Sequence, residues 1–266
     1  MLLKNRSQQP LISLFVIALL GSSCSLNNEQ KSKGITANQP IEESDTNSHS
    51  GNNQHTRLET RPSNVVLTGY PEHRLVTIYK INYNSGAKNG YIGNNNFHRT
   101  YSDISPENLN QWHGHFMPGF EALFGYDLFN IAHYDVRKKQ KQLFFENYSL
   151  INTVYFPSLL QDTLGGKPVL RSYYMVSVYD EDTNKDNLIN RIDLRRFYRF
   201  DLDGLNKTPL TPKDYSVLSS EYDHINDIMF VFAKHDENLN GKTESEEPVH
   251  IFSIDLKQPH LVERLY

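Results

Sequence analysis

Two acidic, asparagine-rich segments carry oxygen-bearing residues at a spacing suited to a divalent cation. Alternating side chains at such a spacing, closed by a final acid, converge on Ca²⁺ in the pattern D-x-[DN]-x-[DN]-G-x5-E. The candidate ligands of the second segment are Asp236, Asn238, Asn240, Lys242, Glu244 and Glu247, and those of the first are Asp182, Asn184, Asp186, Leu188, Asn190 and Asp193. Lys242 and Leu188 stand where the pattern uses a backbone carbonyl. We therefore expect Ca²⁺ at both segments.

Position six of each segment must turn sharply. Gly241 satisfies this requirement in the second segment, and Asn187 replaces it in the first. Asn adopts left-handed backbone more readily than most residues, so the replacement weakens the pattern only slightly. The ligands are all oxygens and too numerous for Mg²⁺ with its waters, which favours Ca²⁺ over Mg²⁺ or Zn²⁺.

The two segments belong to an internal repeat with an offset of 54 residues, from Asp182 to Asp236. The offset also aligns flanking residues, among them Met175 with Met229, Val176 with Phe230, and Leu202 with Leu256. A repeat of this kind predicts supersecondary units that stack because none buries its apolar face alone.

The flanks of both segments indicate strands. Residues 171–179 and 227–233 precede the segments, residues 194–200 and 249–254 follow them, and all are rich in aromatic and β-branched side chains. Each segment thus resembles an EF-hand calcium loop placed in a long hairpin, without the flanking helices of the EF-hand. The alternative is a plain surface turn, because Asp, Asn and Gly are common in turns.

The first residues of the chain predict an export signal. Lys4 and Arg6 precede an apolar stretch over residues 11–20, and Gly21-Ser-Ser-Cys24 follows it. This ending resembles the lipobox of bacterial lipoproteins, although Gly21 stands where that motif prefers Leu. The resemblance implies that residues 1–23 are removed and that Cys24 carries the lipid. The alternative is an ordinary cleaved signal. We expect a lipid-anchored protein of the cell envelope, at the outer membrane of a Gram-negative bacterium.

Composition separates a tether from a folded body. Residues 24–63 contain no aromatic side chain and are dominated by polar residues, which predicts a disordered tether. Residues 64–266 hold almost all of the 16 Tyr and 14 Phe and predict one domain. The formal net charge of −4 disfavours nucleic acid as a partner, and the single cysteine excludes an internal disulfide.

Several apolar runs in the body predict further strands, at residues 65–67, 75–83, 128–134, 149–156, 215–219 and 261–265. Ser105-Pro-Glu predicts the start of one short helix. The basic run Arg137 to Lys141 is expected in a hairpin turn.

One stretch carries a family resemblance. Residues 197–211, with Asp201-Leu-Asp-Gly204 at their centre, look like the end of a TolB-type β-propeller repeat, and residues 131–136 and 251–256 resemble weaker copies. The resemblance implies a mainly β, propeller-like stack of four-stranded antiparallel units with long calcium-loop hairpins. It implies a binding or scaffold module rather than a defined activity.

Catalytic patterns are not prominent, since neither G-x-S-x-G nor H-E-x-x-H occurs. His113 and His115, with His98 and His133 elsewhere, could ligate Zn²⁺ or Cu²⁺, but histidines beside Trp112 are more often structural. We assign no catalytic residue.

Three functions remain after these arguments. The first is a lipid-anchored, calcium-stabilised envelope module that binds protein or glycan without catalysis. The second is an envelope hydrolase or lyase with its site at the mouth of the β-domain. The third is a calcium-responsive assembly factor.

Overall fold

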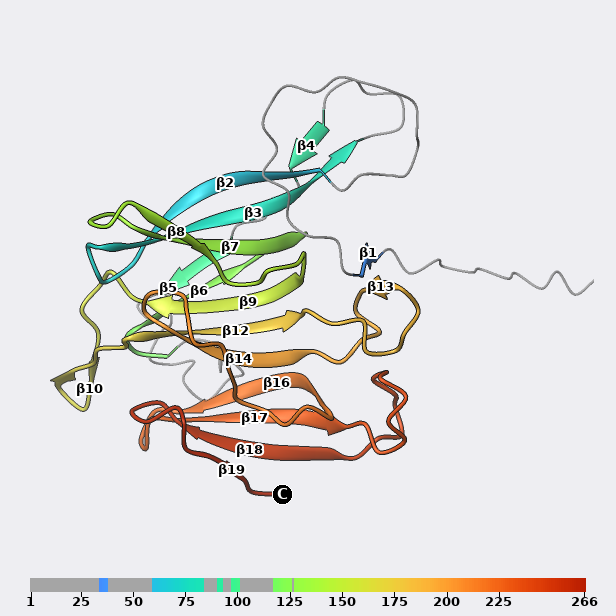
Figure 1. The fold of residues 1–266 in the computed structure, drawn as a ribbon. Coiled ribbons are helices and arrows are strands. Elements are labelled where there is room, and N and C mark those ends of the chain that lie inside the picture. The colour runs from blue at the N-terminus through green and yellow to red at the C-terminus, as the bar shows by residue number, and fades with distance from the viewer. Residues whose placement is uncertain (1–33, 38–58, 84–89, 93–96, 101–116, 126) are drawn as a thin grey trace, which may run out of the picture. The chain divides into compact units, whose positions relative to one another are not determined.

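Apolar strands dominate the body of the protein and assemble into three large antiparallel sheets (Figure 1). The computed structural model describes residues 34–37, 59–83, 90–92, 97–100, 117–125 and 127–266. These residues belong to one unit, Ser32–Tyr266. The described residues form strands and turns and contain no helix, which confirms the mainly β class.

The first large sheet contains β2 (Thr60–Leu67), β3 (His73–Tyr83), β7 (Leu128–Asp135) and β8 (Gln140–Leu143) in that order, with β4 (Gly90–Ile92) also paired to β3. The β7–β8 turn contains Arg137 and Lys138, and Lys139 has the left-handed φ of 53°. The basic run therefore does lie at a hairpin turn, as its composition predicts.

The six-stranded sheet has the order β15 (Thr208–Pro209), β14 (Arg196–Asp201), β12 (Tyr173–Tyr179), β9 (Leu150–Pro157), β6 (Phe120–Phe124) and β5 (Phe97–Thr100). A small hairpin of β10 (Thr163–Leu164) and β11 (Lys167–Pro168) follows β9. Tyr173 and Met175 of β12 belong to one core cluster, while Tyr174 and Val176 belong to another. This sheet is covered on both faces, which explains the unbroken apolar run of β12.

The last sheet is a four-stranded meander of β16 (Tyr215–Asp223), β17 (Ile228–His235), β18 (Val249–Asp255) and β19 (Val262–Arg264). Met229, Val231 and Ala233 of β17 are buried, and the residues between them are only partly buried. The alternation shows that one face of this sheet packs and the other faces outward.

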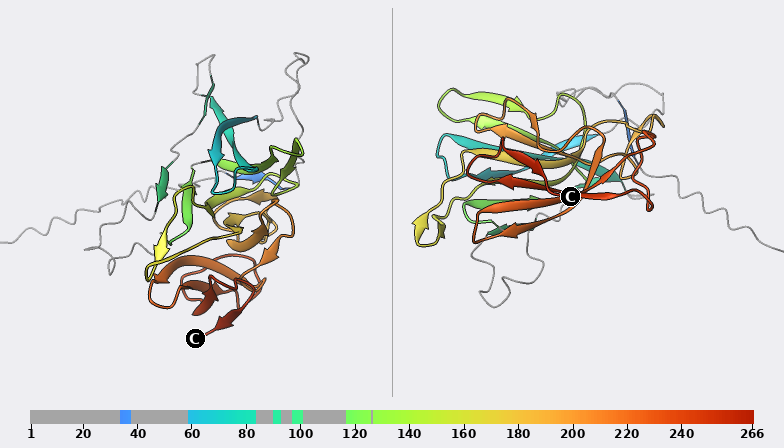
Figure 2. Two further views of the ribbon diagram at one scale, coloured as in Figure 1. Left: turned by 90° about the vertical axis from the view of Figure 1, so that its left-hand side faces the viewer. Right: turned by 90° about the horizontal axis from the view of Figure 1, so that it is seen from below.

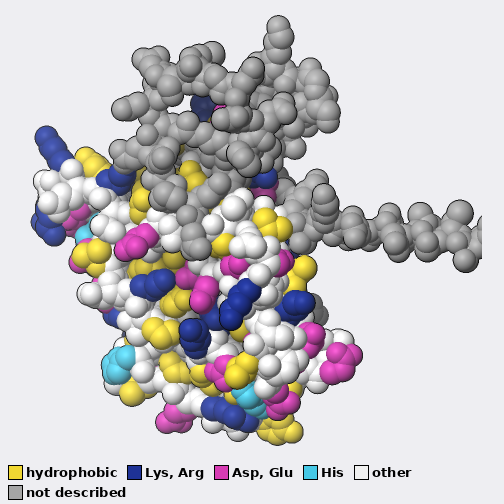
Figure 3. Space-filling model, turned by 45° about the vertical axis from the view of Figure 1, so that its right-hand side comes forward, with side chains coloured by type: hydrophobic (Ala, Val, Ile, Leu, Met, Phe, Trp, Pro, Cys, Tyr) yellow, Lys and Arg dark blue, Asp and Glu magenta, His cyan; other side chains and the backbone are white. Residues whose placement is uncertain are grey.

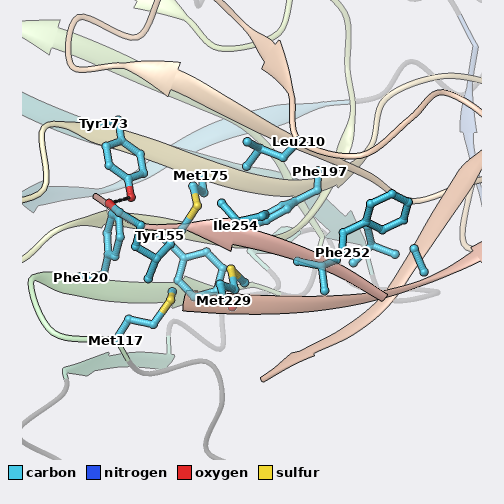
Figure 4. Packing of buried hydrophobic residues seen from close by; sticks show 14 of the residues in the cluster. Met117, Phe120, Tyr155, Tyr173, Met175, Phe197, Leu210, Met229, Phe252 and Ile254 are labelled. Atoms are coloured by element: carbon cyan, nitrogen blue, oxygen red, sulfur yellow. Dashed lines mark hydrogen bonds between the residues drawn. The ribbon is translucent and has the colours of Figure 1, made fainter. Parts of the chain in front are cut away.

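Two hydrophobic cores lie against the six-stranded sheet. One joins it to the four-stranded sheet through Met175, Phe197, Met229 and Ile254 (Figure 4). The other joins it to the first sheet, where Phe144 and Phe200 stack with ring centroids 4.6 Å apart. The result is a layered stack of sheets, seen from two further sides in Figure 2.

The propeller-like expectation is met only in its coarser form. The last sheet has four strands, but the strands of the first repeat lie in a six-stranded sheet. The strand orders are open paths, with no closed barrel or propeller in the described part of the chain. The helix expected from Ser105 falls within residues 101–116, outside the described residues.

The repeat is not exact in strand register. Met175 pairs with Arg199, so the repeat offset requires Met229 to pair with Ser253. Met229 pairs instead with Ile254. Two residues separate Asp193 from β14, but Pro248 alone separates Glu247 from β18. The shorter connection shifts the pairing by one residue.

Part of the predicted tether is ordered against the body. β1 (Ile35–Thr36) pairs with β13 (Leu188–Ile189), and Ile35 is buried. β2 begins at Thr60, inside the predicted tether. Residues 25–33 and 38–58 of the tether, the signal segment and Cys24 lie outside the described residues, so those assignments stay predictions. Within the residues that are described, no helix is both long and apolar enough to cross a membrane.

Candidate metal centre

The two acidic segments are hairpin connections at the same end of neighbouring sheets, on the right-hand side of Figure 1. Residues 182–193 connect β12 to β14 and contain β13, and residues 236–247 connect β17 to β18. We call them loop 1 and loop 2. Their flanking strands are as the sequence predicts.

Loop 2 folds around its side-chain oxygens. Asp236 accepts the backbone N–H of Asn240 on Oδ1 (3.1 Å) and that of Gly241 on Oδ2 (2.9 Å). The N–H of Asn240 is shared with Oδ1 of Asn238 (2.9 Å), and Oδ1 of Asn240 accepts the N–H of Lys242 (2.8 Å). The oxygens of positions one and three therefore converge on one peptide group.

Loop 1 repeats the same four hydrogen bonds at nearly the same lengths. Asp182 accepts the N–H of Asp186 (3.1 Å) and of Asn187 (2.8 Å), Asn184 shares the Asp186 N–H (2.9 Å), and Asp186 accepts the N–H of Leu188 (2.9 Å). Plain turns of similar composition need not reproduce this set. The internal repeat of the sequence is thus also a repeat of backbone conformation.

Left-handed backbone occurs at matching positions. Asn187 and Gly241 at position six have φ of 68° and 73°, and Lys185 and Leu239 at position four have φ of 60° and 55°. The sequence anticipated the turn at position six but not the one at position four. Lys and Leu have no intrinsic preference for left-handed backbone. The oxygen contacts of each loop must therefore hold position four in this conformation.

The loops differ in how their last acid closes them. Asp193 is fully buried, and its Oδ1 accepts the N–H of Thr183 (2.9 Å) while Oδ2 accepts the N–H of Asn190 (2.8 Å). Burial raises the pKa of Asp193, although these backbone donors act in the opposite direction. In loop 2, Oε2 of Glu247 accepts the N–H of Glu244 (2.9 Å), but Oε1 is buried without a hydrogen bond to any described residue. Loop 2 thus keeps a spare acceptor.

The loops also contact each other, through a residue that sequence reasoning missed. Thr183 donates its hydroxyl to the carbonyl of Gly241 (2.6 Å), and Thr243 donates its N–H to the carbonyl of Ile192 (3.2 Å). A Cβ on Gly241 would lie 1.9 Å from the Thr183 carbonyl oxygen. This contact explains why loop 2 requires Gly while loop 1 accepts Asn. Thr183 has Glu237 as its repeat counterpart, so the offset carried no signal for it.

The last acid leaves an oxygen open in loop 2 but not in loop 1, because Oε1 of Glu247 has no hydrogen bond to any described residue whereas both oxygens of Asp193 accept one. An ionised carboxylate has about four acceptor sites, so the hydrogen bonds of Asp236 leave some of them open. Across the part of the chain that is described, no group of three or more His, Cys, Asp or Glu side chains is arranged to hold a metal ion. The candidate ligands of each loop are instead a mixture of carboxylates, amides and a backbone carbonyl, which is the donor set of a calcium loop.

The histidine alternative is only partly visible. His133 is buried in β7, and its Nε2 lies 2.8 Å from Nδ1 of His73, a residue not considered from the sequence. His113, His115 and Trp112 lie outside the described residues, as does the side chain of His98. The suggested Zn²⁺ or Cu²⁺ site therefore stays a prediction.

A scan against models of protein families and a search of curated proteins both find no match. The resemblances to bacterial lipoproteins and to TolB-type repeats accordingly remain predictions from the residues that carry them.

Proposed function

We propose that this protein is a calcium-stabilised β-sheet module of the cell envelope that binds another macromolecule and carries out no catalysis. The observation that carries the proposal is the common hydrogen-bond pattern of loops 1 and 2, which presents oxygens in the order of a calcium loop. The spare buried oxygen of Glu247 supports the same interpretation.

Charge gives the metal a physical role. Loop 1 carries three carboxylates, those of Asp182, Asp186 and Asp193, and loop 2 carries those of Asp236, Glu244 and Glu247. Acids crowded at a hairpin tip repel one another, and a divalent cation turns this repulsion into attraction. Because the loops touch and end neighbouring sheets, Ca²⁺ would hold those sheets together at that end.

The outer face of the last sheet supports a binding role. Ile228, Phe230 and Phe232 are partly buried there, whereas their repeat counterparts Tyr174, Val176 and Val178 are fully buried under the neighbouring sheet. A face that is covered in one repeat unit and open in the next suits a protein partner that adds a further layer. We therefore favour a protein over a glycan as the binding partner. We also propose that the stacked sheets form part of a propeller-like array.

The envelope location rests on the sequence of the export signal and Cys24. A lipid on Cys24 would anchor the module through the residues between Cys24 and the body. This part of the proposal is tested by mass spectrometry of the mature N-terminus, where an unmodified cysteine would contradict it.

Thermal unfolding with and without Ca²⁺ tests the central claim. Envelope-type sites have Kd of about 10⁻⁴ to 10⁻³ M. At about 10 mM Ca²⁺ each site then stabilises the fold by about 1.4 to 2.7 kcal/mol, which raises the melting temperature by several degrees. Equal melting temperatures in Ca²⁺ and in excess chelator would rule the proposal out.

Glu247→Gln is the sharpest variant, because its amide preserves the bond to Glu244 while removing the ionised carboxylate. It is expected to abolish the loop 2 share of the calcium-dependent gain. Glu263→Gln, on exposed β19, is the matched control and should keep the full gain. A Kd in the micromolar range with a change in shape would instead favour the calcium-responsive assembly factor.

A further inference from the structure

A partly buried arginine lies between the six-stranded and four-stranded sheets with no acidic partner among the described residues. Arg195 donates Nε–H to the carbonyl of Val217 (2.6 Å), Nη1–H to Oδ1 of Asn152 (3.1 Å) and Nη2–H to the carbonyl of Leu218. A guanidinium has five N–H donors, so these three bonds leave two for a further acceptor. All three of these acceptors are neutral.

A buried arginine elsewhere between these sheets is treated differently. Arg171 makes a bidentate pair with Asp227, at 2.6 and 3.1 Å. Among the described residues, the ionisable groups whose charges affect the pKa of Arg195 are Tyr179, Tyr155 and the cation Arg191, and none of them is a carboxylate. A desolvated charge without a counter-ion costs free energy, so a buried arginine of this kind usually has a functional role.

Arg195 lines a cavity of about 140 Å³ between the two sheets. Ser177, Ser219 and Thr153 supply polar atoms to the wall, and Phe124, Met229 and Val231 supply apolar surface. The cavity belongs to the same region of the core as Tyr155, Phe197 and Met229 in Figure 4. One part of the wall is thus cationic and hydroxylated, and another part is apolar.

The strands on both walls are irregular at this cavity. The β12–β9 pairing shifts between Ser177 and Val178, and the β16–β17 pairing shifts between Val217 and Ser219. Bulges re-aim side chains and free backbone carbonyls, and they are common beside ligand sites. The second bulge supplies the carbonyls that orient Arg195. Two bulges facing one cavity are an observation independent of its charge.

We propose that this cavity binds a small organic carboxylate, whose two oxygens take the remaining N–H groups of Arg195 while a short alkyl body contacts Phe124, Met229 and Val231. Arginine suits a carboxylate because its planar donors match both oxygens at once. The apolar wall favours an alkyl carboxylate over phosphate or sulfate, which would place a second charge against hydrocarbon. The inference does not depend on calcium.

Calorimetric titration of the full chain with butanoate tests the site, with 1-butanol as the uncharged probe of similar shape. We expect saturable 1:1 binding of butanoate and at least about tenfold weaker binding of 1-butanol. Hydrogen bonds from Arg195 to an ionised carboxylate are stronger than those to a neutral hydroxyl by enough to account for a factor of this size. Phosphate should also bind at least about tenfold more weakly. Equal binding of butanoate and 1-butanol would overturn the proposal, as would no binding of butanoate.

Two variants locate the site, and one serves as control. Arg195→Gln should weaken the binding of butanoate at least about tenfold. Ser219→Phe, which fills the cavity and keeps the Arg195 guanidinium, should weaken it by a similar factor. Arg137→Gln, in the distant β7–β8 turn, should leave affinity unchanged. If Arg195→Gln fails to fold, Ser219→Phe decides alone. Unchanged affinity in a folded Ser219→Phe protein would refute the assigned cavity.

Discussion

At the scale of single residues, Gly241 shows how a contact between loops fixes one amino acid. Its φ is 73°, and a side chain at this position would place its Cβ 1.9 Å from the backbone carbonyl oxygen of Thr183. Gly241→Ala is therefore expected to destabilise the fold by roughly 2 kcal/mol or more, from backbone strain together with overpacking. Urea denaturation measures the loss. Asn187→Gly, at the exposed counterpart, is the matched control and should change stability by less than about 0.5 kcal/mol.

His133 is expected to make the stability of the fold depend on pH. Burial, followed by the neighbouring His73, lowers the pKa of His133 from 6.5 to about 4. The unfolded chain then binds a proton below about pH 6.5 that the folded chain takes up only near pH 4. Stability should accordingly be complete above that window and fall by about 3 kcal/mol as the pH drops through it. The measurement is urea denaturation at several pH values.

The control for this prediction is His133→Gln, which cannot titrate. Carboxylates also lose stabilising interactions in acid, so the informative quantity is the difference between the two proteins. The wild type should lose more stability than the variant between pH 6.5 and 4. Parallel pH profiles would show that His133 is not responsible.

At the scale of elements, an ion pair and the two loops hold opposite ends of the same two sheets. Arg171, just before β12, bonds Asp227, just before β17, and also donates to the carbonyls of Pro118 and Leu256. Arg171→Met leaves the Asp227 carboxylate buried and should cost about 3–5 kcal/mol in urea denaturation. Asp227→Asn keeps the left-handed turn at φ 63° and removes the charge. The double variant should be less destabilised than the sum of the single ones, and strict additivity would contradict a coupled pair.

Periodicity made most long strands predictable, because β3, β7, β9, β12 and β17 are locally apolar or alternating. The environment of each strand was not predictable. The runs of β12 and β17 read alike, yet β12 is buried on both faces and β17 on one, and this depends on which sheet lies next to each. The pairing of Ile35 with Ile189 joins segments far apart in sequence and leaves no local signal. Likewise the spacing of acids indicated both loops, but Thr183 and Arg195 act through contacts that only the packed sheets create.

At the scale of the whole molecule, charge is dispersed while the candidate ligand sites are concentrated. Basic and acidic side chains are interspersed over the face shown in Figure 3. The loop acids, by contrast, gather at one end of two sheets that share a core. Stabilisation by Ca²⁺ is therefore expected to act at that end and to affect both sheets, because they share this core.

The contact between loops predicts that two calcium ions bind cooperatively. Ordering of loop 2 fixes Gly241, whose carbonyl holds Thr183, and Thr183 in turn contacts Asp193 and the N–H of Leu194. An ion in one loop thus prepares the other, and linkage requires the effect to be equal in both directions. Calorimetry should show Ca²⁺ affinity at loop 1 falling several-fold in Glu247→Gln, and affinity at loop 2 falling by the same factor in Asp182→Asn. Thr183→Val should remove this coupling and keep both sites, whereas Thr208→Val, on exposed β15, should preserve it. Affinities that stay the same when the neighbouring site is lost would show that the loops bind independently, and the contact would then serve packing alone.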